Sequence, residues 1–234
     1  MKRSFLFTAG VVCVAGLALA ACGPDGKPPK PSNNHWNDKA STVKARLECP
    51  DKQGELTRVS VAPDGKSCTY TAKDAEVVIR HLPVGPEGAQ AALAPIENDL
   101  RTIVPFEVRK PTPGGKHTEI NLPGLHITAH DDEGGDGGAA EVRVAGIHIN
   151  ANENGAEIRA EHFGENAVRA SLILAAGDDA PEQHVVGYEA RGPANGPLVV
   201  AVVKAKDRDY TDNKDKDGVF SSMKKLVRMN VDEK

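Results

Sequence analysis

Alternating apolar and polar positions predict a small antiparallel meander over residues 56–82. The Pro-Asp-Gly sequence at 63–65 supplies a turn after the first run, because glycine tolerates a positive φ. Two further runs, 67–72 and 77–82, complete a three-stranded unit.

The spacing of apolar residues changes after this meander and predicts a helix over residues 86–104. The residues that recur at helical spacing are Leu93, Ile96, Leu100 and Val104. Pro95 lacks a backbone N–H, so it predicts a kink or a split into two short helices.

The middle of the chain holds an internal repeat. Residues 118–130 align with residues 140–152 at an offset of 22, with five identical positions, and a partial third copy covers 156–160. Apolar positions alternate within each copy and change phase across Gly124 or Gly146, which indicates a turn or a bulge. A β-solenoid needs three or more full copies, so we expect successive hairpins in one sheet.

Asn154–Gly155 predicts a two-residue hairpin turn, because both residue types tolerate positive φ. Counting outward from that turn gives a buried face and a polar face. The predicted buried pairs are Ala151–Ile158 and Ile149–Ala160, and the predicted polar pairs are Asn152–Glu157, Asn150–Arg159 and His148–Glu161.

The last third of the chain predicts another hairpin and a helix. Residues 198–203 are apolar at every position, which is typical of a central strand covered on both faces. A later helical stripe consists of Phe220, Met223, Val227 and Val231, with Asp217 as a predicted N-cap. The predicted fold class is therefore α+β, with a mainly antiparallel sheet of hairpins, one central helix and one C-terminal helix.

An apolar leader over residues 5–21 follows the basic pair Lys2 and Arg3 and ends at Leu19-Ala20-Ala21-Cys22. This ending resembles the lipobox of bacterial lipoproteins. The resemblance implies removal of residues 1–21, acylation of Cys22 with chains such as palmitate, and membrane lipid as the first partner. Gly23 after the cysteine implies the outer membrane, with the domain on its periplasmic face. An ordinary secretory signal peptide is the first alternative, because Ala18-Leu19-Ala20 also fits a cleavage site, and an uncleaved anchor is the second.

The expected organisation is a signal peptide (1–21), a Pro- and Gly-rich tether (22–42) and one domain (43–234). Its expected parts are a disulfide meander (43–84), a helix (86–104), repeat hairpins (117–175) and a C-terminal hairpin and helix (183–231). The net charge is −4, and loss of Lys2 and Arg3 with the leader makes the mature charge −6. This acidity argues against a nucleic-acid partner.

Four cysteines reduce to one pair, because Cys13 leaves with the leader and Cys22 carries the lipid. In an oxidising periplasm, Cys49 and Cys68 predict a disulfide bond. Neither a metal-ligand spacing nor a Cys-x-x-Cys motif surrounds them.

Residues 133–139 (Glu-Gly-Gly-Asp-Gly-Gly-Ala) match the glycine loop of methyltransferases as a string. That loop needs a following helix, whereas residues 141–144 continue with period two, so we reject methyltransferase activity. Residues 47–50, 56–60 and 64–70 weakly resemble uncharacterised Gram-negative envelope lipoproteins.

Asn213, Asp215 and Asp217 resemble the first half of a calcium loop. Lys224 stands where the bidentate glutamate should be, so a solvated loop is the favoured interpretation. We expect no cofactor and no metal site.

The repeats place polar residues on one strand face. The residues of this candidate interaction face are His126, Thr128, His130, His148 and Asn150. No nucleophile, metal-protease or phosphate-binding motif accompanies them, so enzyme status has no support from the sequence. The predicted function is a lipid-anchored, non-catalytic binding or scaffolding module with an envelope protein partner. The alternative is a periplasmic ligand-binding protein or enzyme whose site is assembled from scattered residues.

Overall fold

A computed structural model describes residues 38–108, 116–122, 125–131, 139–144, 146–177, 183–206 and 218–233. These residues belong to one compact unit of the chain, His35–Lys234. The helices are α1 (Gly88–Ile103) and α2 (Val219–Met229). The strands are β1 (Ser41–Val43), β2 (Lys52–Gln53), β3 (Leu56–Val61), β4 (Ser67–Ala72), β5 (Ala75–Leu82), β6 (Lys116–Leu122), β7 (Leu125–Asp131), β8 (Ala139–Val144), β9 (Ile147–Asn152), β10 (Gly155–Phe163), β11 (Ala167–Ala176), β12 (Val185–Pro193), β13 (Leu198–Ala205) and β14 (Val231–Glu233).

Twelve of the strands form one antiparallel sheet in the order β2-β3-β4-β5-β13-β12-β11-β10-β9-β8-β7-β6. Two chain-order meanders, β2–β5 and β6–β13, join where β5 pairs with β13. The helix α1 lies between these meanders in the sequence, and β1 pairs separately with β14. The predicted α+β class is confirmed, and the repeats are successive hairpins, β6–β7 and β8–β9, with β10 as the partial third copy.

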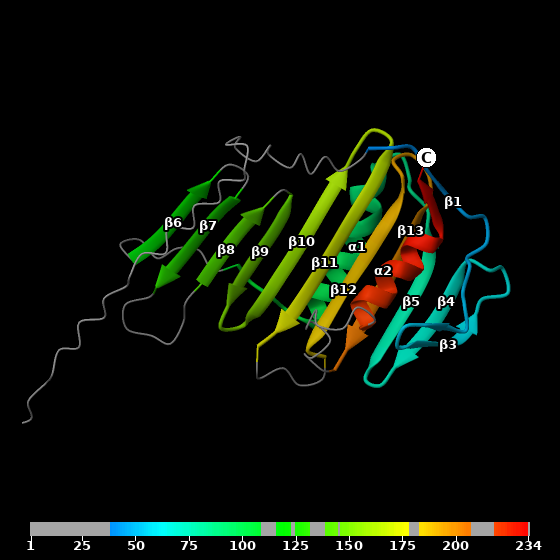
Figure 1. Cartoon of the computed structure of the whole chain (residues 1–234), viewed down its shortest axis with the longest axis horizontal. Coiled ribbons are helices and arrows are strands. Elements are labelled where there is room, and N and C mark those ends of the chain that lie inside the picture. The colour runs from blue at the N-terminus through cyan, green and yellow to red at the C-terminus, as the bar shows by residue number, and fades with distance from the viewer. Residues whose placement is uncertain are drawn as a thin grey trace, which may run out of the picture. The chain divides into compact units, whose positions relative to one another are not determined.

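The two helices cover opposite faces of the sheet (Figure 1). Because strand side chains alternate, each long strand contributes to two cores. The face under α1, which we call the α1 face, packs Leu172, Tyr188 and Val200 against Leu93 and Leu100. The opposite α2 face packs residues such as Val77, Val203 and Tyr70 against the helix residues Met223 and Leu226. The strand β13 contributes to both cores, as its continuous apolar run predicts.

The disulfide between Cys49 and Cys68 is present, with 6.5 Å between the two Cα atoms. It ties the segment before β2 to β4. Beside it, the Tyr70 hydroxyl donates a hydrogen bond of 3.1 Å to the carbonyl of Pro50. Among the described residues, no helix is long and apolar enough to cross a membrane.

Of the two outcomes predicted at Pro95, a kink or a split, the split does not occur, because α1 is one continuous helix. A proline removes the bond to the carbonyl four residues earlier, here that of Ala91. Both Pro95 and Ala91 are exposed, so water can bind the freed carbonyl.

The C-terminal helix is shorter than predicted, because Val231 lies in β14 and pairs with Val43. Buried Asn230 ends the helix. Its side-chain amide donates to the carbonyls of Leu226 (2.9 Å) and Glu48 (3.0 Å). The predicted N-cap Asp217 lies outside the described residues.

The predicted turn at Asn154–Gly155 is also wrong. Asn152 pairs with Gly155, so the two turn residues are Glu153 and Asn154. The observed pairing differs from the predicted one by two residues, which keeps the same side chains on each face.

The prediction of which face is buried is wrong as well. Glu157, on the polar face of β10, is only 5% exposed, whereas Ile158 on the apolar face is 36% exposed. The reason is that α1 covers the polar side of β10, where Arg101 forms an ion pair with Glu157.

Candidate functional site

Polar side chains form two rows that cross the repeat strands on the α1 face. Cross-strand pairing aligns His126, Arg143, His148 and Arg159 in a basic row. Glu119, Thr128, Glu141, Asn150 and Glu157 align in an acidic row beside it. The rows arise from the repeat, because the copies place Glu119, Glu141 and Glu157 at one equivalent position and His126 and His148 at another.

The part of these rows on β6–β9 is here called the polar repeat face: Glu119, His126, Thr128, Glu141, Arg143, His148 and Asn150. The Thr128 hydroxyl lies 3.0 Å from His126 Nε2. His126 Nδ1 lies 3.8 Å from Glu119, and Arg143 Nε donates a hydrogen bond of 2.6 Å to Glu141. Neighbouring polar side chains therefore contact one another on a partly exposed sheet surface.

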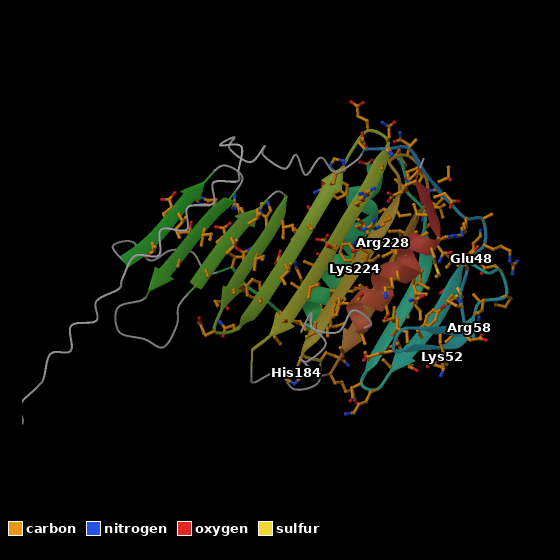
Figure 2. All side chains as sticks on the ribbon, viewed as in Figure 1. Glu48, Lys52, Arg58, His184, Lys224 and Arg228 are labelled. Carbon is orange, nitrogen blue, oxygen red and sulfur yellow. A yellow bond between two sulfur atoms is a disulfide. The ribbon has the colours of Figure 1, made fainter. Side chains whose placement is uncertain are left out.

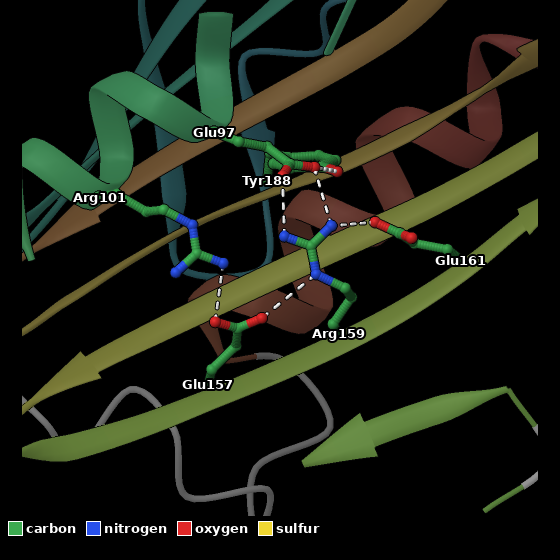
Figure 3. A network of polar contacts seen from close by, with 6 residues as sticks. All are labelled: Glu97, Arg101, Glu157, Arg159, Glu161 and Tyr188. Atoms are coloured by element: carbon green, nitrogen blue, oxygen red, sulfur yellow. Dashed lines mark hydrogen bonds and ion pairs between the residues drawn. The ribbon is translucent and has the colours of Figure 1, made fainter. Parts of the chain in front are cut away.

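The third copy of the repeat carries the same pattern into the protein interior. Glu157 and Arg159 of β10 meet Glu97 and Arg101 of α1, as Figure 3 shows. Arg101 donates to Glu157 at 2.8 Å, and Arg159 donates to Glu97 at 2.8 Å and 3.2 Å.

Two further residues complete this network. The Tyr188 hydroxyl of β12 donates a hydrogen bond of 2.6 Å to Glu97. Arg159 also contacts Glu161 and lies 3.2 Å from Glu157. We call the six residues Glu97, Arg101, Glu157, Arg159, Glu161 and Tyr188 the α1 clamp, because they connect the helix to β10 and β12.

The contacts within the clamp move the pKa values of Glu97 and Tyr188 further away from neutral pH. Burial acts to raise the pKa of Glu97, but the hydrogen bonds from Arg159 and Tyr188 and the charges of Arg159 and Arg101 outweigh it, so this pKa lies below its ordinary value. Burial and the bond to Glu97 raise the pKa of Tyr188. A general acid or base works best with a pKa near the operating pH, so the clamp favours a structural role over proton transfer.

The structure brings the predicted interaction residues onto one face. His126 and Thr128 lie on β7, and His148 and Asn150 lie on β9. His130 is also in β7, but its side chain is outside the described residues. Arg143 of β8 lies between His126 and His148 in the row, so the two histidines are on strands that are not neighbours.

Metal binding gains no support from the described part of the chain, where no group of three His, Cys, Asp or Glu side chains could hold an ion. Cys22 and the calcium-loop residues Asn213, Asp215 and Asp217 lie outside the described ranges.

The α1 clamp itself was not predicted. One signal was present in the sequence: Glu157, Arg159 and Glu161 alternate with apolar residues, and Glu97 and Arg101 are one helical turn apart. Each set alone is typical of a solvated surface. Only the tertiary arrangement shows that the helix covers the charged side of the strand.

A scan against protein-family models finds no match, and a search of curated proteins finds no significantly similar sequence.

Proposed function

We propose that the chain is a lipid-anchored protein of the cell envelope, and that its polar repeat face binds a helix of an envelope partner without catalysing a reaction. The lipobox ending at Cys22 and the Pro- and Gly-rich segment after it support the anchoring. The segment enters the domain at Asp38, whose carboxylate accepts hydrogen bonds from the backbone N–H groups of Glu165, Asn166 and Ala167.

One observation carries the partner-binding proposal. In the third repeat copy, Glu157 and Arg159 bind Arg101 and Glu97 of α1. Glu141 and Arg143 occupy the equivalent positions of the second copy and form an ion pair with each other on the exposed surface. The second copy therefore offers another helix the same charges that α1 uses on the third.

The spacing of the copies also suits a second helix. Equivalent strands β8 and β10 are two positions apart in the sheet, which is about 10 Å. Packed helices have axes 8–10 Å apart. A partner helix on β8 and β9 would thus lie beside α1, with Glu and Arg four residues apart facing Arg143 and Glu141.

Site-specific photo-crosslinking tests this proposal. A photoreactive residue in place of Asn150 should crosslink one envelope protein in intact cells, at a helix with Glu and Arg four residues apart. Exchanging the charges in the double variant Glu141→Arg/Arg143→Glu should lower the yield at least fivefold. The matched control exchanges the two charges of the surface ion pair Lys44–Glu48 and should leave the crosslinking yield unchanged. An unchanged yield in the first variant, or a crosslink to a non-helical segment, would contradict the proposal.

The histidines of the face provide a second test. Replacing His126, His130 and His148 together by Asn should change the free energy of unfolding by only about 0.5 kcal/mol, because His126 is partly exposed and His148 is exposed. A membrane pull-down should nevertheless lose the partner. Recovery of every partner found with the parent protein would show that the imidazoles do not form the interface.

A further inference from the structure

A cleft of about 700 Å³ lies on the other face of the sheet, between α2, β14 and strands β9–β12. Its volume is in the range of small-molecule binding sites. Lys224 and Arg228 of α2 line one side of it, and Figure 2 shows both side chains on the helix in front of the sheet.

The charges in this cleft are not balanced. Its four cationic residues are Arg169, Arg191, Lys224 and Arg228, and its two carboxylates are Glu189 and Glu233. Glu233 lies 2.6 Å from Arg169 and 3.4 Å from Arg191, and Glu189 lies 2.8 Å from Arg191. Across the described residues, neither Lys224 nor Arg228 has a carboxylate within ion-pair distance. They are one helical turn apart and leave two positive charges in excess.

The floor of the cleft becomes less polar with distance from α2. Cross-strand pairs align Glu189 with Ser171, Ser171 with Ala160, Ala160 with Ile147, and Ile147 with Val144. The small side chains of Ser171 and Ala160 leave room above the strands. From β11 to β8 this row extends roughly 14 Å.

The apolar end of the floor is continuous with an uncovered apolar surface. A neighbouring row on the same face consists of Ile173, Ile158, Ile149, Val142, Ile127 and Ile120. Ile120, Val144, Ile147 and Ile158 are among the exposed large hydrophobic residues of the described chain. Contiguous exposed apolar surface of this kind marks binding sites in soluble domains.

We propose that the cleft binds one lipid with a phosphate monoester head group. The phosphate binds between Lys224 and Arg228, and the acyl chain lies over Ser171, Ala160 and Ile147. A phosphate monoester carries a charge of about −1.5 to −2 at neutral pH, which matches the two unpaired cations. A free phosphate ion would leave the apolar floor uncovered, and an uncharged acyl chain would leave the cations unpaired. This site is on the opposite face from the polar repeat face and does not depend on the partner-binding proposal.

Calorimetric titration of the full chain carrying Cys22→Ser, with lysophosphatidic acid below its micelle concentration, tests the site. We expect one lipid to bind per chain. The double variant Lys224→Gln/Arg228→Gln should bind at least tenfold more weakly. Lys66→Gln/Lys73→Gln removes the same charge from exposed positions away from the cleft and should bind as the parent does.

The acyl-chain site needs its own variants. Ala160→Phe fills the floor and should weaken binding at least tenfold. Ile147→Gln, at an exposed position, gives the same test with less risk to folding and should also weaken binding. Inorganic phosphate and lysophosphatidylcholine should each bind at least tenfold more weakly than lysophosphatidic acid.

Three results would overturn the proposal. Lys224→Gln/Arg228→Gln could bind lysophosphatidic acid as tightly as the parent does, Ile147→Gln could do so, or the parent could bind inorganic phosphate as tightly as lysophosphatidic acid. Sedimentation with phosphatidylglycerol vesicles distinguishes the remaining case. A chain that sediments with these vesicles but takes up no monomeric lipid would bind a membrane surface instead.

Discussion

Glu97 is the residue on which the attachment of α1 depends most directly. Its carboxylate accepts hydrogen bonds from Arg159 of β10 and Tyr188 of β12, so one side chain connects the helix to two strands. Hydrogen bonds to a charged group contribute about 1.5–3 kcal/mol, more than neutral ones. Removing this carboxylate would also leave the partly buried Arg159 with less compensation for its charge.

Glu97→Gln should lower the free energy of unfolding by about 2 kcal/mol at neutral pH. The effect should depend on pH, because the pKa of Glu97 in the folded protein lies below its ordinary value of 4.5. A depressed carboxyl pKa stabilises the fold fully above the unfolded-state pKa, and this stabilisation is lost as the pH falls through the folded-state pKa. Chemical denaturation between about pH 7 and pH 3 measures it, and the difference from the parent should shrink below about pH 4.5.

Asp99→Asn is the matched control, because Asp99 is an exposed acid on the same helix. This variant should be close to the parent at every pH. A Glu97→Gln protein whose deficit stays constant down to pH 3 would show that the ionised carboxylate does not hold the helix.

At the level of elements, the β9–β10 hairpin shows why the predicted turn was displaced. The side chain of Asn152 accepts a hydrogen bond of 2.9 Å from the backbone N–H of Asn154, which closes the turn one residue earlier than predicted. Gly155 then begins β10 with a φ of +144°. A Cβ atom at this position would lie 2.1 Å from the carbonyl oxygen of Ala175 in β11. The glycine is thus required by the neighbouring strand as well as by the turn.

Gly155→Ala should therefore destabilise the protein by more than about 1 kcal/mol, since the new methyl group meets backbone and the φ is unfavourable for alanine. Thermal denaturation measures the loss. The control is Gly85→Ala, where a Cβ would have no neighbour within 4 Å. Equal stabilities of the two variants would mean that β11 moves away at little cost.

The Cys49–Cys68 disulfide closes a loop with a sequence separation of 19. In the chain-entropy account, such a loop contributes about 3 kcal/mol by restricting the unfolded chain. Cys49→Ser/Cys68→Ser should lose up to this amount in urea unfolding, and a reductant should destabilise the parent without affecting the variant. Insensitivity of the parent to reductant would show that the bond is not formed in the protein produced by cells.

Local patterns were sufficient to predict most strands and both helices, including the buried strand over 198–203. They predicted which side chains share a face, because alternation in a strand is a local property. They did not predict which face is covered. Glu157 and Ile158 look like an outward and an inward residue until α1, more than fifty residues earlier, is placed on the polar side.

On the scale of the whole described domain, the two cores and the repeat surfaces occupy different parts of one sheet. Both helices pack on strands near β11–β13, whereas none of the described side chains of β6–β9 is a buried member of either core. The repeat strands β6–β9 therefore add little to helix packing, but they supply the polar repeat face and, through Ile147, the apolar end of the cleft floor. Sequence analysis located the polar surface through its histidines, but the cleft beside α2 is lined by residues from six separate elements and has no local signature.

Membrane attachment through Cys22 is the prediction on which the envelope location depends. Each buried methylene of an acyl chain contributes about 0.8 kcal/mol, so the several chains of a lipoprotein anchor hold the protein on the membrane, whereas one chain binds only marginally. Cys22→Ser should therefore move the protein from the membrane fraction to the soluble fraction and abolish incorporation of labelled palmitate.

Cys13→Ser is the matched control for this experiment, because Cys13 lies inside the predicted leader and would be removed with it. The control should keep both the membrane fraction and the palmitate label. If Cys22→Ser stays on the membrane without label, the cleft and the apolar row beside it become the surfaces to test next. Adding Lys224→Gln/Arg228→Gln to Cys22→Ser would then release the protein if the cationic cleft holds it there. Retained label in Cys22→Ser would contradict the lipobox itself.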